Sequence, residues 1–314
     1  MDSDQTKIKI VFCGSDDISV PIFVDLLKYT TVLALITTPD KPAGRGNKIV
    51  FAKVKQIAIE NNIPILQPEK LKDEAFVGEL EKINPELIIV AAYGKILPAA
   101  MLQLPKYGVI NFHPSLLPKY RGSSPIQSAL LNGDAVSGVS IIQMNEKMDS
   151  GNIIIQKEFE ITKEDDYFSI ADRSAMIGLG LIRETIDKFR MNKVSSIEQV
   201  ENQATYCQKI DKTAGKINWN QSSTEIFNQV RAYCDWPICY TIYDKKKFEI
   251  IKSQNSELDP EIGIGQVFKD GKKVYVRCGQ NCLEILKVKM EGKKELMIND
   301  FLNGQPKFIG ATLE

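Results

Sequence analysis

Residues 107–118 read YGVINFHPSLLP, and this stretch decides the fold class. The segment 109–112 is mostly apolar, as in a strand that a parallel sheet buries on both faces. Pro114 has no backbone N–H to donate, so the predicted strand stops there and leaves His113 at its carboxyl end. Alternate side chains of a strand share a face, which brings Asn111 and His113 together. Open parallel sheets bind their ligands at this end.

The pattern around this strand predicts an α/β domain over residues 1–190. Short apolar runs alternate with segments of helical period, as βα units of a parallel sheet do. Strands are expected at 8–13, 32–37, 65–67, 87–92 and 109–112, and helices at 19–29, 54–61, 73–84 and 98–104. A helix at 124–131, strands at 139–143 and 153–159, and a long amphipathic helix over 165–189 complete this domain.

The pattern changes after residue 190. Residues 191–206 are polar and weakly periodic, which predicts a linker. Over 207–314, strand-sized pieces divided by Gly, Asp and Lys turns predict a small all-β domain, a barrel. Its strands are expected at 237–242, 248–252, 265–268, 274–277 and 282–288. Basic residues slightly outnumber acidic ones in this part, which is weak evidence for contact with RNA.

Composition excludes several classes of protein. The 314 residues include 40 basic and 40 acidic side chains, so the net charge is zero and a nucleic acid would need a local patch. A polar start and the lack of a long apolar run predict a cytoplasmic protein with no membrane partner. One histidine and six cysteines without a CxxC pair predict reduced thiols and no metal. The segment 12–17 lacks the glycines of a dinucleotide fingerprint, which argues against a dehydrogenase.

An amide and an imidazole on one strand face suit nucleophilic attack on a carbonyl carbon. Asn111 would hold the developing oxyanion, and His113 would carry or move a proton. Asp149 lies in MDSG at 148–151, a tight loop between two predicted strands, and would favour the protonated form of His113. A structural histidine at a strand end and an ordinary turn are the alternative explanations.

Residues 111–122, NFHPSLLPKYRG, followed by MDSG, resemble the motif of the folate-dependent formyltransferase family. Five further segments are similar to the branch of this family that formylates methionyl-tRNA. They are TPDKPAGRG at 38–46, AYGKILP at 92–98, RGSSPIQ at 121–127, ATY at 204–206 and DWP at 235–237. The resemblance spans both predicted domains. It implies a Rossmann-like formyltransferase domain followed by an OB-like β-barrel that binds tRNA.

The resemblance also implies a reaction and its site. The formyl group of 10-formyltetrahydrofolate would pass to the α-amine of methionyl initiator tRNA through a tetrahedral intermediate. Asn111 and His113 would stabilise that intermediate, with Asp149 orienting His113. The folate cosubstrate would lie against a segment of four residues, Ser115, Leu116, Leu117 and Pro118. No metal is implied, and we expect a monomer.

A basic loop is the predicted contact with tRNA. The stretch 41–55 contains five basic residues and no acidic one. Charge runs usually form solvated surface, which is the alternative here. The resemblance favours a flexible arm that neutralises acceptor-stem phosphates through Lys41, Arg45 and Lys48, with Arg45 as the main discriminating contact.

Other functions stay open at this point. HPSLLP is equally typical of the glycinamide ribonucleotide formyltransferases, which lack the PAGRG loop and the second domain. A formyltransferase that acts on a nucleotide or sugar amine is therefore the enzymatic alternative. A protein that keeps the fold and binds RNA without turnover is the alternative from another class.

Overall fold

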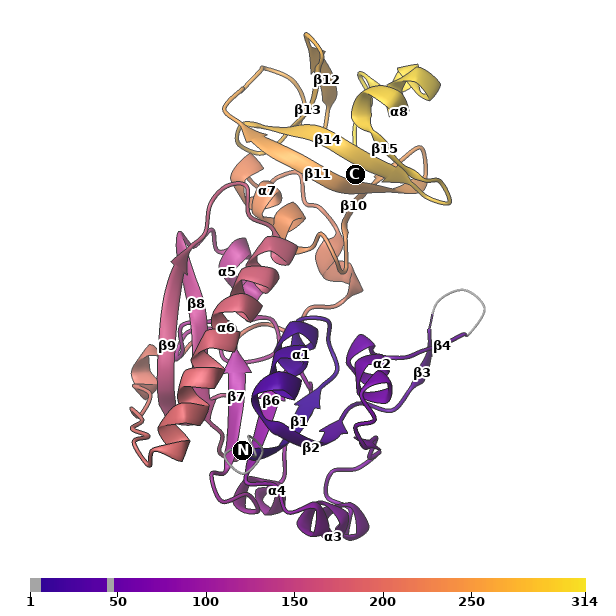
Figure 1. Ribbon diagram of the computed structural model, residues 1–314. Coiled ribbons are helices and arrows are strands. Elements are labelled where there is room, and N and C mark those ends of the chain that lie inside the picture. Colours follow the sequence, from indigo (N-terminus) through magenta and orange to yellow (C-terminus); the bar gives the residue numbers. More distant parts are fainter. Residues whose placement is uncertain (1–6, 44–47) are drawn as a thin grey trace. The chain divides into compact units, whose positions relative to one another are not determined.

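The computed structural model describes residues 7–43 and 48–314. The chain forms two compact units (Figure 1). One unit contains the chain up to residue 125 with 136–160 and 171–207, and the other contains 126–135, 161–170 and 208–314. Each unit has its own sheet.

The first unit is an α/β unit built on a seven-stranded sheet in the order β5-β2-β1-β6-β7-β8-β9. Its strands are β1 (Lys9–Gly14), β2 (Thr31–Ile36), β5 (Ile65–Leu66), β6 (Leu87–Ala91), β7 (Val109–His113), β8 (Val136–Gln143) and β9 (Ile153–Glu160). The five strands from β5 to β7 are parallel, whereas β8 and β9 pair antiparallel. The predicted fold class is confirmed, and β7 runs to His113 itself.

Helices cover both faces of this sheet. Helices α1 (Ser19–Tyr29), α2 (Lys53–Glu60) and α6 (Tyr167–Arg190) contribute to the apolar layer on one face (Figure 1). Helices α3 (Glu74–Ile83) and α4 (Ala99–Gln103) contribute to the layer on the other. The short helix α5 (Pro125–Leu131) follows β7 in the chain. The central strands are therefore buried on both faces, which explains their continuous apolar sequence.

Helix α6 approaches β7 closely at a glycine. A Cβ on Gly178 would lie 2.4 Å from Cε2 of Phe112, whereas a Cβ on Gly180 would meet nothing within 4 Å. Phe112 is 3% exposed and points away from the face that carries its neighbours Asn111 and His113. The distance between the helix and the sheet thus depends on the missing side chain of Gly178.

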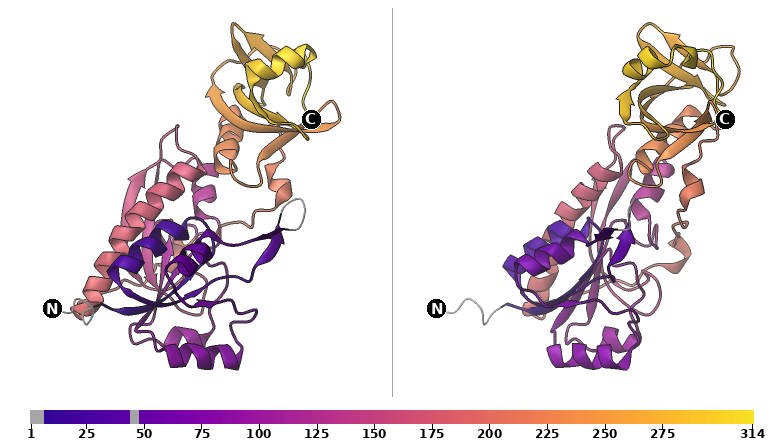
Figure 2. Two further views of the ribbon diagram at one scale, coloured as in Figure 1. Left: turned by 45° about the vertical axis from the view of Figure 1, so that its right-hand side comes forward. Right: turned by 90° about the vertical axis from the view of Figure 1, so that its right-hand side faces the viewer.

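Two short strands lie within the stretch expected to be a loop. Strands β3 (Lys41–Ala43) and β4 (Lys48–Val50) pair antiparallel as a ribbon separate from the main sheet (Figure 2). At the base of the ribbon, Lys55 Nζ donates to Asp40 and, at 2.8 Å, to Oε1 of Gln67. The hydrogen bond from Lys55 lowers the pKa of the Asp40 carboxyl.

The second unit contains an antiparallel sheet in the order β10-β11-β14-β13-β12, with β15 beside β14. Its strands are β10 (Cys239–Tyr243), β11 (Lys246–Ser256), β12 (Val267–Asp270), β13 (Lys273–Arg277), β14 (Cys282–Met290) and β15 (Glu295–Met297). The last residues join the two edges: Val267 N donates to Ala311 O at 2.8 Å, and Ile242 N donates to Glu314 O at 3.1 Å. These bonds close the predicted barrel.

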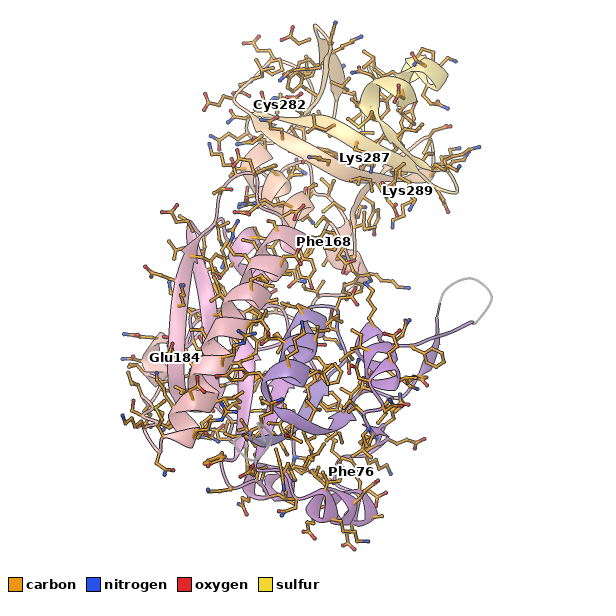
Figure 3. All side chains as sticks on the ribbon, in the orientation of Figure 1. Phe76, Phe168, Glu184, Cys282, Lys287 and Lys289 are labelled. Carbon is orange, nitrogen blue, oxygen red and sulfur yellow. The ribbon has the colours of Figure 1, made fainter. Side chains whose placement is uncertain are left out.

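An aromatic cluster fills the barrel, and charged pairs lie on its strands. Phe248 and Phe308 have ring centroids 5.1 Å apart, and Tyr243 and Phe301 contact both rings at similar distances. On β14, two lysines labelled in Figure 3 form ion pairs with glutamates. They are Lys287 with Glu295, at 2.5 Å, and Lys289 with Glu249, at 3.1 Å.

The second unit also contains two helices that the all-β prediction omitted, α7 (Ser223–Ala232) and α8 (Ile298–Gly304). A reciprocal capping box between Ser222 and Glu225 begins α7. Both tryptophans of the chain lie in this unit: Trp219 is buried and donates to Thr241 Oγ1 at 3.0 Å, while Trp236 is 46% exposed.

A helix needs about 20 mostly apolar residues to span a bilayer. Within residues 7–43 and 48–314, no helix combines the length and the apolar character needed to span a membrane.

Candidate active site

Asn111 and His113 lie side by side on β7, as the strand alternation predicts. Their face of the sheet is apolar at Val109 and becomes polar toward the carboxyl end of the strand. Asn111 is 8% exposed and His113 is 4% exposed. Two polar side chains that are nearly excluded from water need defined partners, and each has them.

The two ring nitrogens of His113 face different oxygen atoms. Its Nε2 lies 2.9 Å from the carbonyl oxygen of Tyr120, and since a carbonyl can only accept, Nε2 carries a hydrogen. Its Nδ1 lies 3.8 Å from Oδ2 of Asp149. That separation is longer than a hydrogen bond, so Nδ1 is not hydrogen-bonded to the carboxylate.

Asp149 reaches this face by an indirect route. Its loop leaves β8 after Gln143, which pairs with Ile110 near the start of β7, and the loop then folds back along the sheet. Asp149 has a positive φ of 46° and is followed by Gly151, whose Cβ would lie 1.7 Å from the carbonyl oxygen of Gln143. Only glycine fits so close to the neighbouring backbone.

The carboxylate of Asp149 connects the two β7 side chains. Its Oδ1 accepts from Asn111 Nδ2 at 3.4 Å, and its Oδ2 accepts from the backbone N–H of Gly122 at 2.8 Å. The structure therefore brings the carboxylate of Asp149, from a separate segment, to the amide and the imidazole on β7. Such a group can stabilise negative charge on a carbonyl oxygen and transfer a proton.

The segment predicted to contact folate is held in place by hydrogen bonds. Ser115 is fully buried, and its hydroxyl donates to Lys119 O at 2.7 Å. The Ser140 hydroxyl donates to Ser115 O at 2.5 Å and accepts from Leu117 N at 3.1 Å. Leu117 is buried, whereas Leu116 and Pro118 are half-buried. These bonds fix the segment beside the end of β7.

The buried thiol at the end of β1 is unsuited to act as a nucleophile. Cys13 is fully buried, and this burial raises the pKa of its thiol far above the usual range. The thiolate is the reactive form, so Cys13 is inert at neutral pH. In the parts of the chain that the structure describes, no group of three or more His, Cys, Asp or Glu is placed to hold a metal ion.

The predicted tRNA contacts lie in and around the β3–β4 ribbon. Lys41 belongs to β3 and Lys48 to β4, and Arg45 lies outside the described residues. Two other lysines of the basic stretch have intramolecular partners: Lys53 pairs with Asp17, and Lys55 pairs with Asp40.

Sequence reasoning assigned no role to Arg121 and Gln199. Arg121 is 1% exposed, and its Nε donates to Gln199 Oε1 at 3.0 Å. Gln199 in turn donates to the carbonyl oxygens of Asp149 and Gly151, both at 2.8 Å. Arg121 belongs to the NFHPSLLPKYRG motif, so its position in that motif could have marked it as a site residue. Gln199 lies in the polar stretch 191–206, where no local pattern marks it.

Two family models and several relatives match the chain along most of its length. A family model described as "Formyl transferase" matches residues 9–186, and one described as "Formyl transferase, C-terminal domain" matches residues 209–306. The chain is 39% identical over 299 residues to a methionyl-tRNA formyltransferase of Caldanaerobacter subterraneus subsp. tengcongensis, covering 95% of this chain and 97% of that one. It is also 39% identical to a methionyl-tRNA formyltransferase of Thermodesulfovibrio yellowstonii, covering 94% and 96%.

Solved structures share the fold at lower identity. WlaRD, a sugar 3N-formyl transferase solved in the presence of dTDP and 5-N-formyl-THF, has a TM-score of 0.66 at 24% identity and covers 92% of this chain and 99% of its own. HypX from Aquifex aeolicus, in complex with tetrahydrofolic acid, has a TM-score of 0.67 at 16% identity and covers 96% and 48%.

Proposed function

Because the chain belongs to the methionyl-tRNA formyltransferase family, we propose that it transfers the formyl group of 10-formyltetrahydrofolate to the α-amine of methionyl initiator tRNA. We assign Asn111, His113 and Asp149 as its catalytic residues. The observation that carries this assignment is the Asp149 carboxylate, 3.4 Å from the amide nitrogen of Asn111 and 3.8 Å from Nδ1 of His113.

The folate supplies a formyl carbon that an amine can attack, and the side chains of the protein stabilise the charges that develop during the attack. The Asn111 amide has two hydrogens, of which one faces Asp149, so the second is available to the formyl oxygen. Nδ1 of His113 is not hydrogen-bonded to Asp149, so it can donate to the same oxygen once the imidazole is protonated. The carboxylate of Asp149 balances the charge of that imidazolium and accepts the proton that the amine loses. The tetrahedral intermediate then collapses, the bond between the formyl carbon and N10 of the folate breaks, and this proton passes to N10 so that tetrahydrofolate leaves.

The folate site we propose uses the segment Ser115, Leu116, Leu117 and Pro118. Its backbone is fixed through Ser140, as described above, and the half-buried side chains of Leu116 and Pro118 offer an apolar surface. A rigid apolar wall beside convergent polar groups fits a flat pterin ring. A bound folate would thereby place its formyl group toward Asn111 and His113.

For the tRNA we propose two contact regions. One is the β3–β4 ribbon, with Lys41, Arg45 and Lys48 as phosphate contacts. The other is the C-terminal domain that we propose over 207–314. Its hairpin turns expose Lys272, Lys293 and Lys294. A chain with zero net charge needs such local basic groups to hold RNA.

The test is formyl transfer with labelled 10-formyltetrahydrofolate to charged methionyl initiator tRNA, with deacylated tRNA as the control. His113→Ala should slow transfer by about a hundredfold or more, while tRNA binding stays unchanged. Equal activity of wild type and His113→Ala would contradict the assignment. Transfer to a nucleotide or sugar amine in preference to methionyl-tRNA would favour the alternative substrate class instead.

A further inference from the structure

Arg121 is the largest side chain that the described structure buries almost completely. Its Nη1 donates to Tyr206 Oη at 3.1 Å and to the carboxylate of Glu201 at 3.0 Å. The Glu201 side chain is 75% exposed, so water screens this ion pair. Burying a guanidinium whose counter-charge is screened costs free energy, so the other contacts of Arg121 matter.

The backbone of Arg121 holds a strap formed by residues 199–207. Its N–H donates to Thr205 O at 2.9 Å, and its carbonyl accepts from Cys207 N at 2.8 Å. The strap belongs to the α/β unit and lies across the motif that follows β7. The next residue, Gly122, donates its N–H to the Asp149 carboxylate. Two adjacent residues thus make both contacts: Arg121 binds the strap, and Gly122 binds the Asp149 carboxylate.

Gln199 completes the connection from the strap side. It is 7% exposed, and its amide uses both ends: Oε1 accepts from Arg121, and Nε2 donates to the carbonyl oxygens of Asp149 and Gly151. A glutamine side chain makes this set of bonds in only one orientation, and Arg121 fixes that orientation because it can only donate.

We propose that Gln199, oriented by Arg121, is a positioning residue that holds the Asp149 loop in its reactive geometry. This inference rests on the proposed function. Asp149 needs such support because its loop leaves β8 at the far end of β7 and because its own φ is 46°. A shift of about 1 Å in a reacting group can slow an enzyme a hundredfold.

Two substitutions of Gln199 separate positioning from simple structural support. Gln199→Leu removes every side-chain hydrogen bond of this residue. Gln199→Glu keeps an acceptor for Arg121 but removes the donors to the Asp149 loop. We expect both to lower kcat about tenfold to a hundredfold, with the KM of either substrate changed less than about twofold. If Gln199→Glu keeps wild-type kcat, Gln199 serves only Arg121 and the proposal is wrong.

The matched control is Gln203→Leu, the same substitution on the same strap. Gln203 is exposed, so we expect wild-type kinetics. A double-mutant cycle adds the decisive comparison: in an Asp149→Asn background, Gln199→Leu should cost less than about twofold, because its effect passes through Asp149. Full additivity of the two losses would overturn the proposal.

A second readout does not depend on turnover. His113 is the only histidine of the chain, so its imidazole gives a single set of NMR resonances. Gln199→Leu should move the His113 Cε1–H resonance in the direction that Asp149→Asn moves it, and Gln203→Leu should not. If wild type fails to formylate methionyl-tRNA, the proposed function fails, and these resonances still decide the positioning. An unmoved resonance in Gln199→Leu refutes the positioning alone.

Discussion

Gly178→Ala should destabilise the α/β unit, although alanine is the better helix former. The new Cβ would lie 2.4 and 2.5 Å from two ring atoms of Phe112. Carbon atoms rest at about 3.5 Å or more, so the overlap is about 1 Å. The ring is 3% exposed and lies in the core, so we take the upper end of the cost of overpacking, about 3 kcal/mol.

The gain in helix propensity from glycine to alanine offsets about 1 kcal/mol of that cost. We therefore expect the free energy of unfolding to fall by about 2 kcal/mol in Gly178→Ala. Gly180→Ala on the same helix has nothing within 4 Å of its new Cβ, and it should gain about 1 kcal/mol. The two variants should differ by about 1 M in urea midpoint if the m-value is about 3 kcal/mol/M.

Urea titration of the full chain by circular dichroism measures both variants, and hydrogen exchange of the β7 peptide assigns the transition to the α/β unit. Phe112 lies between Asn111 and His113 in the chain, so Gly178→Ala should also slow formyl transfer, whereas Gly180→Ala should not. If Gly178→Ala is as stable as Gly180→Ala, the contact between the new Cβ and the Phe112 ring does not carry the expected cost of overpacking.

Three further predictions concern other parts of the chain. Arg45→Ala should raise the KM for methionyl-tRNA about tenfold and leave the KM for folate unchanged in steady-state assays. An unchanged KM for methionyl-tRNA would show that Arg45 does not contribute to tRNA binding. Ser222→Ala should cost the second unit about 1 kcal/mol in thermal melts. The Ser222 hydrogen bonds lower the pKa of the Glu225 carboxyl. They therefore stabilise the folded state above the unfolded pKa of about 4.3, and this stabilisation is lost as pH falls through the folded pKa. The difference in stability between Ser222→Ala and wild type should accordingly become smaller in acid. Burial raises the pKa of Cys282 to about 11, so iodoacetamide at neutral pH should label Cys282 only after unfolding, and rapid labelling of the native protein would contradict this.

The parallel part of the fold was predictable because its signals are local. Period-two alternation and a proline placed Asn111 and His113 on one face, and the structure confirms it. The capping box before α7 is also a local signal, because Ser222 and Glu225 stand three residues apart in the sequence. The β3–β4 ribbon was not predictable by period, since its strands have three residues each.

The site was predictable only in part, because its remaining contacts join distant segments. The bond between Arg121 and Gln199 spans 78 positions, and the one between Gln199 and Asp149 spans 50. No periodicity within residues 191–206 indicates that one glutamine is buried while its neighbours are exposed. Such contacts depend on how the strap docks, which local propensity does not determine.

The placement of both tryptophans gives the second unit an optical label of its own. Trp219 is 4% exposed and Trp236 is 46% exposed, and the α/β unit contains neither. Intrinsic fluorescence excited selectively at the indole therefore reports on the second unit alone. A change in indole emission on adding tRNA would register RNA at that unit without any dye.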